Sequence, residues 1–145
     1  MSKINIFSDG SVNPKTKRGG WACLVSGENI ESFMMFDGEE NTTIGRMELS
    51  PVIDALKELE DNSDVVLTSD SKYVVNMIKE EWIDKWKKSN WINSSGKEVK
   101  NLDLVKELDE QIKRHNVEAV WVKSHSNHHE NEICDKVAKS QAFIK

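Results

Sequence analysis

Two acidic residues of this chain stand where short apolar segments end. Asp9 follows the alternating residues 3–8, and Asp70 follows residues 64–69, which include a Val-Val-Leu run. If the two segments are neighbouring parallel strands, both carboxylates lie at the edge where open α/β sheets bind ligands. There they repel each other unless a divalent cation lies between them. The pair therefore predicts a metal site, whereas either Asp alone is equally typical of a turn or a helix N-cap.

The surrounding segments predict an α/β sheet that would position these acids. Residues 21–26 and 30–37 predict an antiparallel hairpin, because residues 27–29 have turn character, and residues 11–20 predict a loop. Apolar spacing predicts the other elements: helices over 71–80, 82–88 and 102–114, a strand over 117–122, a polar loop over 123–132, and a final helix with Ile133, Val137 and Ala138 on its apolar stripe. This order predicts a mixed sheet with helices on its faces.

A third acid, Glu48, belongs to a predicted helix whose start is ambiguous. Apolar residues between Leu49 and Leu59 have helical spacing. Ser50 followed by Pro51 is a strong start signal, but Thr43 could instead cap an earlier start. We prefer the earlier start, with a distortion near Pro51, because proline removes a helical hydrogen bond. Glu48 then lies in the first turns of the helix.

Length and composition limit the class of protein. The 145 residues predict one domain, residues 1–145, and the 37% hydrophobic and 31% charged residues are typical of a soluble globular protein. No apolar run approaches the roughly 20 residues that a membrane span needs. Because the first six residues lack a signal-peptide core, we expect a cytoplasmic protein. Cys23 and Cys134 are far apart in sequence and predict reduced, buried thiols.

The charge of the chain is unevenly distributed. The formal net charge is -5, yet residues 82–100 carry five lysines against two acids. Three tryptophans are interleaved with these lysines and could stack on bases while the lysines contact phosphates. Equally, the tryptophans could form a small core beneath a solvated lysine face. The segment is therefore a candidate nucleic-acid surface on a chain whose overall charge opposes broad nucleic-acid binding.

Five segments of the chain resemble, in order, the motifs of type 1 ribonuclease H. They are Phe-Ser-Asp-Gly-Ser at 7–11, Arg-Met-Glu-Leu at 46–49, Thr-Ser-Asp-Ser-Lys-Tyr-Val at 68–74, Trp-Ile-Asp-Lys-Trp-Lys-Lys at 82–88, and Trp-Val-Lys-Ser-His-Ser-Asn-His-His-Glu-Asn-Glu-Ile-Cys-Asp at 121–135. The resemblance covers nearly the whole chain. It implies a ribonuclease H-like fold, with a mixed five-stranded sheet and helices on both faces. It also implies an endonuclease that hydrolyses the RNA strand of RNA/DNA hybrids and leaves 5′-phosphate ends.

The resemblance also implies roles for particular residues. The carboxylates that would hold two Mg²⁺ ions, with Mn²⁺ as an alternative, are Asp9, Glu48, Asp70 and Asp135. His125 would be a mobile histidine that assists product departure or proton transfer, and Glu132 is a lesser candidate. Magnesium favours oxygen ligands, so an all-carboxylate set suits it. We expect His128 and His129 to be exposed to solvent.

Substrate contacts are implied as well, and here the chain departs from the family pattern. The candidate substrate-binding residues are Asn13, Thr43, Arg46, Lys72, Trp82, Trp86, Lys87, Lys88 and Trp91. The family often has asparagines where this chain has Ile44 and Gly45, and a glutamine where it has Lys72. Ser124 replaces a usual glycine. The departures bear on substrate preference more than on metal chemistry.

Two other functions remain open at this stage. A hybrid- or duplex-binding module without turnover would retain metal binding, and a nuclease of the same fold could act on duplex RNA or DNA. The complete set of carboxylates favours the active hybrid ribonuclease. We expect a monomer that needs no nucleotide cofactor, since no phosphate-binding glycine loop is present, and that has no membrane partner.

Overall fold

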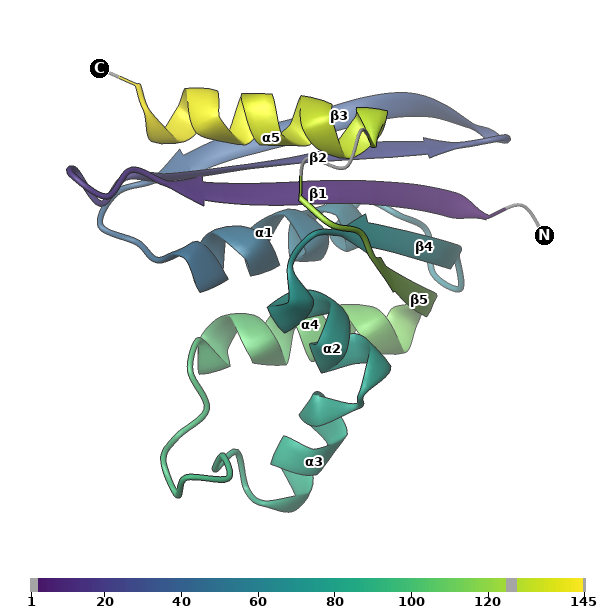
Figure 1. Cartoon of the computed structure of the whole chain (residues 1–145). Helices are drawn as coiled ribbons and strands as arrows, with labels where there is room; N and C mark the ends of the chain where they lie inside the picture. Colours follow the sequence, from purple (N-terminus) through teal and green to yellow (C-terminus); the bar gives the residue numbers. More distant parts are fainter. Residues whose placement is uncertain (1–2, 125–127, 145) are drawn as a thin grey trace.

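The computed structural model describes residues 3–124 and 128–144, which form a five-stranded sheet and five helices (Figure 1). The strands are β1 (Ile4–Val12), β2 (Gly19–Gly27), β3 (Ile30–Glu39), β4 (Asp64–Ser69) and β5 (Asn116–Trp121). The helices are α1 (Ile44–Lys57), α2 (Lys72–Lys79), α3 (Trp82–Lys88), α4 (Leu102–Arg114) and α5 (His129–Ala142). No helix in this part of the chain is both long and apolar enough to span a membrane.

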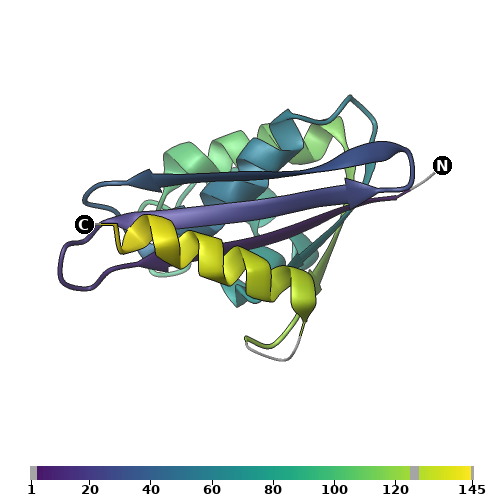
Figure 2. The same ribbon diagram turned by 90° about the horizontal axis from the view of Figure 1, so that it is seen from above.

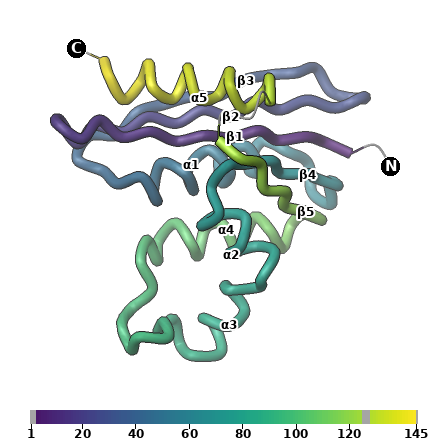
Figure 3. Tube along the Cα trace, viewed as in Figure 1, coloured from purple at the N-terminus to yellow at the C-terminus, as the bar shows by residue number. Residues whose placement is uncertain are grey.

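The sheet has the strand order β3-β2-β1-β4-β5. Strands β1, β2 and β3 form an antiparallel meander, while β4 pairs parallel to β1 and β5 pairs parallel to β4. The tube in Figure 3 follows this path, with α1 connecting β3 to the parallel half of the sheet. The predicted mixed five-stranded sheet is therefore confirmed.

Helices cover both faces of the sheet, as predicted. Helix α5 lies along one face, and α1 lies against the other with α4 packed beyond it (Figures 1 and 2). The alternation along β1 serves both layers, because Ile6 belongs to the large core on the α1 side and Phe7 to a smaller core with Ala138 of α5. Both cysteines are buried and free, which confirms the prediction of reduced thiols.

Two predicted boundaries were wrong. Strand β1 does not end at Asp9 but continues to Val12, because the antiparallel ladder with β2 pairs residues 9–12 with residues 19–22. Helix α5 begins at His129, so the last polar residues of the predicted 123–132 loop are helical. Its most buried positions are Cys134, Ala138 and Ala142, whereas Ile133 and Val137 are half-buried. The first turn of α5 consists of polar residues, so no apolar periodicity marks the start of the helix.

Helix α1 starts at the earlier of its two candidate sites. Thr43 is the N-cap residue, and the helix runs through Pro51. One residue before the proline, the hydroxyl of Ser50 donates to the carbonyl of Arg46 over 2.8 Å. The early start places Glu48 in the second turn of the helix, on the half that approaches the sheet.

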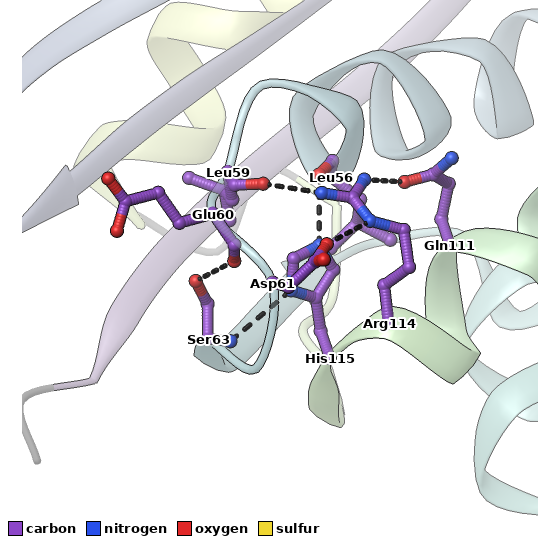
Figure 4. Close-up of polar contacts among 8 residues, drawn as sticks. All are labelled: Leu56, Leu59, Glu60, Asp61, Ser63, Gln111, Arg114 and His115. Atoms are coloured by element: carbon purple, nitrogen blue, oxygen red, sulfur yellow. Dashed lines mark hydrogen bonds and ion pairs between the residues drawn. The ribbon is translucent and has the colours of Figure 1, made fainter.

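Hydrogen bonds of His115 and Arg114 close the corner between the C-terminal end of α1 and β4 (Figure 4). The buried ring of His115 contacts the Leu56 carbonyl through Nε2 at 3.0 Å, and its Nδ1 accepts from the Ser63 N–H at 3.3 Å. The guanidinium of Arg114 donates to the Asp61 carboxylate, the Leu59 carbonyl and the Gln111 side chain. The corner fixes the register in which β4 enters the sheet.

Candidate active site

The parallel ladder between β1 and β4 brings two carboxylates together. Its last pair is Ser8 with Ser69, so Asp9 and Asp70 are the next residues on the two chains. Because β1 continues past this point only in its pairing with β2, Asp9 lies within a strand but at the end of the parallel ladder. The structure thus confirms that the two segments are adjacent parallel strands whose acids share one edge.

A glycine allows α1 to bring Glu48 close to this edge. A Cβ atom at Gly10 would overlap the backbone carbonyl of Met47, so only glycine permits this approach of α1 to β1. The same carbonyl lacks its helical donor, because Pro51 four residues later has no N–H. Helix α1 therefore contacts β1 directly beside Asp9, and Glu48 is the next residue of the helix.

Helix α5 approaches the opposite face in a similar way. A Cβ atom at Gly20 would overlap the backbone of Ala138, so α5 also packs at backbone contact distance. The thiol of Cys134 donates to the Phe7 carbonyl, with 3.4 Å between sulfur and oxygen. Asp135 follows Cys134 directly and is thereby held beside the end of the parallel ladder.

The acids share electrostatic strain. Burial, the negative charge of Asp70 and a hydrogen bond with Asp135 raise the pKa of Asp9 from 3.8 to about 8. Burial also raises the pKa of Glu48, a hydrogen bond with Ser71 opposes that rise, and the Asp70 charge adds to it. The site therefore concentrates carboxyl groups that cannot all ionise without a compensating positive charge.

A small pocket opens among these acids. Its lining residues are Asp9, Asp70, Lys123, Ser124, His128, Asn131, Glu132 and Asp135. Two buried polar atoms of the lining, Nδ1 of His128 and Oδ1 of Asn131, have no hydrogen-bond partner among the described residues. Glu48 contributes to the electrostatics of the site from α1 rather than to the lining of this pocket.

One prediction for the histidine cluster was wrong. His128 is half-buried, and its ring packs on Phe7 with 5.5 Å between centroids, because it caps α5 against the sheet. His129 is exposed, as predicted. His125 lies outside the described residues.

Sequence reasoning missed several residues of this site. Ser71, which binds Glu48 and also caps α2 by accepting from the Val74 N–H, could have been found as the polar residue directly after Asp70. Asn131, which donates to the Thr68 carbonyl at 3.3 Å, gave no signal beyond its place in a polar segment. Only the fold brings Ser71 to Glu48 and Asn131 to the end of β4.

The donor set fits a hard divalent cation. Within residues 3–124 and 128–144, no three acidic, histidine or cysteine side chains already converge as a set of metal ligands. Burial, followed by the Asp70 charge and the hydrogen bond with Asp135, raises the pKa of Asp9, and a bound cation would stabilise the ionised carboxylate. Carboxylate oxygens are the ligands that Mg²⁺ prefers. The residues present thus match the predicted ion.

Three candidate substrate contacts lie near the N-terminal end of α1 and the β1–β2 turn. Thr43 is exposed, and its side chain makes no capping hydrogen bond. Asn13 accepts from the Lys15 N–H at 3.0 Å, which shapes the turn. Arg46 instead binds both carboxylate oxygens of Asp103, at 3.0 and 3.1 Å. Arg46 therefore connects α1 to α4 in this structure.

The other candidate contacts lie on α2 and on the segment that follows it. The ammonium of Lys72 is 4.8 Å from the ring centroid of Trp121. The remaining candidates belong to α3 and the loop that follows it, which extend away from the sheet in Figure 1: Trp82, Trp86, Lys87, Lys88 and Trp91. We call residues 82–100 the protrusion.

The protrusion has features of both predicted alternatives. Its three tryptophans are half-buried and pack against the core, and the rings of Trp82 and Trp86 are 6.1 Å apart. Lys87 forms an ion pair with Asp109 at 2.7 Å, whereas Lys88 is exposed. A groove nevertheless runs along it, lined in part by Trp82, Lys85 and Trp86.

The strand order and the acids contributed by β1, the end of β4, α1 and α5 define a ribonuclease H-like α/β protein. A sequence profile of the family RNase H matches residues 1–143. The chain is 48% identical over 139 residues to Ribonuclease HI of Haemophilus ducreyi, covering 96% of this chain and 90% of that protein. It is 41% identical over 140 residues to Ribonuclease H of Caldicellulosiruptor saccharolyticus, covering 97% and 96%. The chain belongs to the ribonuclease H family.

Solved structures agree with this assignment. The crystal structure of LC9-RNase H1, a type 1 RNase H with the type 2 active-site motif, is similar with a TM-score of 0.83 and 28% identity, covering 97% of this chain and 72% of that chain. The foamy viral protease-reverse transcriptase in complex with dsDNA has a TM-score of 0.73 at 18% identity, covering 98% and 94%. The second likeness concerns the fold alone.

Proposed function

We propose that the chain is an endoribonuclease that hydrolyses the RNA strand of RNA/DNA hybrids and leaves 5′-phosphate ends. Membership of the ribonuclease H family over nearly the whole chain supports this activity. The observation that carries the proposal is the convergence of Asp9, Asp70 and Asp135, where burial and the two neighbouring acids raise the pKa of Asp9 to about 8. Such a cluster is costly to a protein that does not use it.

The proposed ligands of two Mg²⁺ ions are Asp9, Glu48, Asp70 and Asp135. When bound, such a pair of ions activates a water molecule, neutralises the phosphoryl oxygens and stabilises the leaving oxygen. Asp9 has a central place in the set, because its carboxyl group interacts with both Asp70 and Asp135. Mn²⁺ is an alternative because it has similar ligand preferences.

The surrounding residues hold these carboxylates in place. The Gly10 N–H donates to Asp9 at 2.9 Å, and Ser71 makes a hydrogen bond with Glu48. Lys139, one helical turn after Asp135, forms an ion pair with it at 3.1 Å. These contacts restrict the rotation of Asp9, Glu48 and Asp135 before an ion or a substrate arrives. For His125 we retain the proposed role in product departure or proton transfer.

The protrusion is the proposed contact for the DNA strand. Lys85 and Lys88 are exposed, and the half-buried tryptophans leave part of their rings accessible along the groove. Lysines contact phosphates without reading sequence, which suits an enzyme that acts on many hybrids. Recognition of the RNA strand depends on the 2′-hydroxyl, and Asn13 and Thr43 are the proposed residues nearest to the acids for that strand.

We also propose that the protein functions in the cytoplasm. The free, buried thiols of Cys23 and Cys134 support a reducing compartment. Burial raises the pKa of both thiols to about 12, which keeps them protonated and unreactive.

The test is cleavage of an end-labelled RNA strand presented in an RNA/DNA hybrid, in duplex RNA and alone. Each substrate is incubated with Mg²⁺ or with a chelator, beside the Asp70→Asn variant. We expect cleavage of the hybrid with Mg²⁺ only, and a loss of at least about a thousandfold in the variant, because an amide cannot supply the ligand charge.

Other outcomes would favour the other two functions. Hybrid binding without cleavage by a folded protein that still binds Mg²⁺ would identify a binding module. Cleavage of duplex RNA would show that Ile44, Gly45 and Lys72 change the choice of substrate. Near-normal cleavage by Asp70→Asn would contradict the assignment of the metal ligands.

A further inference from the structure

We propose that Ser124 is a positioning residue that holds Asp70 in the orientation needed for Mg²⁺ binding. The inference rests on the proposed function, since it concerns the same acidic site. Its starting point is a hydrogen bond, in which the Ser124 hydroxyl donates to Oδ2 of Asp70 over 2.7 Å. Ser124 stands where the family usually has glycine, which has no side chain to make this contact.

The backbone on both sides of this hydrogen bond is held independently. The indole N–H of Trp121 donates to the Asp70 carbonyl at 3.0 Å. The Val122 N–H donates to the Ser69 carbonyl, also at 3.0 Å, and so extends the pairing of β4 with β5 by one more bond. The segment 121–124 therefore runs beside Asp70 in a defined register. This register places the Ser124 hydroxyl within hydrogen-bond distance of the Asp70 carboxylate.

A second departure from the family pattern lies on the same assembly. Lys72, at the usual position of a glutamine, has its ammonium 4.8 Å from the centroid of the Trp121 ring. This cation–π contact favours the orientation in which the Trp121 indole reaches the Asp70 carbonyl. Lys72 thus contacts the first residue of the segment 121–124, and Ser124 is its last residue. In this chain both departures act on Asp70 rather than loosening the site.

The chemistry of the bond explains why it would matter for metal binding. The charge of Asp70 opposes the ionisation of Asp9 and Glu48, so when these acids ionise to bind a metal ion, repulsion favours rotation of an untethered Asp70 carboxylate away from them. A hydroxyl that donates to one carboxylate oxygen opposes this rotation and leaves the other oxygen available as a ligand. Hydrogen bonds that orient metal ligands in this way commonly change metal affinity by about 10- to 100-fold.

The experiment compares the parent protein with Ser124→Ala, which removes the donor, and Ser124→Thr, which retains it. Ser124 is exposed, so the additional methyl group of threonine has room. Mg²⁺ binding is measured by calorimetry without substrate, and hybrid cleavage is measured across a Mg²⁺ titration. Melting temperatures in chelator show whether each variant is folded.

For Ser124→Ala we expect Mg²⁺ affinity about 10- to 100-fold weaker than in the parent, and a matching rise in the Mg²⁺ concentration for half-maximal cleavage. At saturating Mg²⁺ kcat should return toward the parent value, with KM for the hybrid unchanged throughout. Ser124→Thr should behave as the parent does, because its hydroxyl can make the same bond. A purely structural role would lower the melting temperature and leave Mg²⁺ affinity unchanged.

Two results would overturn the inference while leaving the proposed function intact: Ser124→Ala that binds Mg²⁺ as the parent does, or folded Ser124→Thr that is as impaired as Ser124→Ala. Failure of the parent itself to bind Mg²⁺ and cleave the hybrid would instead refute the proposed function, and the inference with it. Measurements on the parent protein therefore distinguish failure of this inference from failure of the proposed function.

Discussion

At the level of single residues, Asp9 is where the requirements of folding and of function conflict most strongly. Its carboxyl group is partly buried beside two other acids, and its pKa rises to about 8 as a result. The folded, metal-free protein therefore keeps a proton on Asp9 at pH values where the unfolded chain, with a pKa near 3.8, has lost it. The protonated form of Asp9 favours the stability of the fold, whereas the ionised form is needed to bind a cation.

The sign of the pH dependence follows from these two pKa values. The contribution of Asp9 to stability is fully present below pH 3.8 and is lost as the pH rises to about 8. In chelator, Asp9→Asn should remove this dependence, so that at about pH 8 the variant exceeds the parent in free energy of unfolding by about 2 to 4 kcal/mol. Urea unfolding in chelator at a series of pH values measures the difference.

Cleavage should respond to the same substitution in the opposite direction. We expect Asp9→Asn to abolish hybrid cleavage, because it removes a proposed metal ligand, and to reduce the stabilisation that Mg²⁺ gives the parent. At about pH 4 the two proteins should be nearly equal in stability, since Asp9 is then protonated in the folded parent. A variant less stable than the parent at every pH would contradict the assignment of strain to Asp9.

At the level of elements, close packing of two helices on the sheet builds the site. Gly10 admits α1 to one face and Gly20 admits α5 to the other, each at a distance that a Cβ atom would prevent. The acids on these helices thereby reach the end of the β1–β4 ladder. The placement of Glu48 and Asp135 depends on residues that take no part in chemistry.

Gly10→Ala tests this dependence. The added Cβ atom overlaps the Met47 carbonyl, a backbone atom that cannot move without moving α1. We expect a loss of about 1 to 3 kcal/mol in the free energy of unfolding. Displacement of Glu48 by about 1 Å should reduce kcat about a hundredfold. Thermal unfolding and single-turnover cleavage measure the two effects.

Gly27→Ala is the matched control for this substitution. Gly27 ends β2 at the other end of the β1–β2 ladder from Gly10, and its nearest new contacts would be Cγ1 of Ile30 and the Lys3 carbonyl oxygen, both at 3.3 Å and so without the overlap found at Gly10. This variant should keep normal cleavage. Equal loss of activity in both variants would show that any alanine in the sheet disturbs the site, and that the approach of α1 has no special role.

The corner between α1 and β4 supports a prediction about stability alone. His115→Ala would leave the Ser63 N–H without its partner, whereas the Leu56 carbonyl would still accept from the Leu59 N–H at 3.2 Å. Because one unsatisfied polar group costs about 1 to 3 kcal/mol, we expect the free energy of unfolding to fall by about 1 to 3 kcal/mol. His129→Ala, at an exposed position, should change it by less than about 0.5 kcal/mol. A small effect at His115 would mean that water replaces the ring.

At the level of the whole molecule, charge is divided between two regions. The acidic cluster lies at the edge of the sheet, whereas lysines are concentrated on the protrusion of a chain whose net charge is -5. With this division, a nucleic acid can bind to the lysines of the protrusion while its phosphate backbone lies at the cation site formed by the acidic cluster. The affinity for the hybrid would then fall as the salt concentration rises, whereas the rate of the chemical step would not change.

The double variant Lys85→Ala/Lys88→Ala tests this division. Each phosphate contact contributes about 0.9 to the slope of log affinity against log salt concentration, so the slope for hybrid binding should fall by about 1 to 2. Because the acids are untouched, kcat at saturating hybrid should be unchanged. Fluorescence anisotropy at several salt concentrations, beside steady-state kinetics, measures both quantities.

A charge-matched control is available at the opposite end of the β1–β4 ladder. Lys3→Ala/Lys57→Ala removes two exposed lysines whose partners, Glu118 and Glu107, are each 3.8 Å away. This variant should keep the salt slope of the parent. If both double variants reduced the slope equally, net charge rather than the protrusion would govern binding.

Much of the architecture could be predicted because its signals are local. The periodicity over 82–88 and 102–114 matched α3 and α4, and the resemblance to ribonuclease H type 1 predicted the mixed sheet that is observed. Less local features were predicted poorly. The extension of β1 to Val12 depends on pairing with β2, and the polar first turn of α5 has no apolar periodicity of its own.

The sequence by itself determined the types of chemistry available: the four carboxylates Asp9, Glu48, Asp70 and Asp135, and lysines with tryptophans in one segment. Only the tertiary structure decided which of these act together. It raised the pKa of Asp9 by burying it beside Asp70 and Asp135, it paired Arg46 with Asp103, and it brought Ser124 to Asp70. The physical reason is that electrostatic and hydrogen-bond energies depend on distance and burial in space, which residues far apart in sequence acquire only by folding.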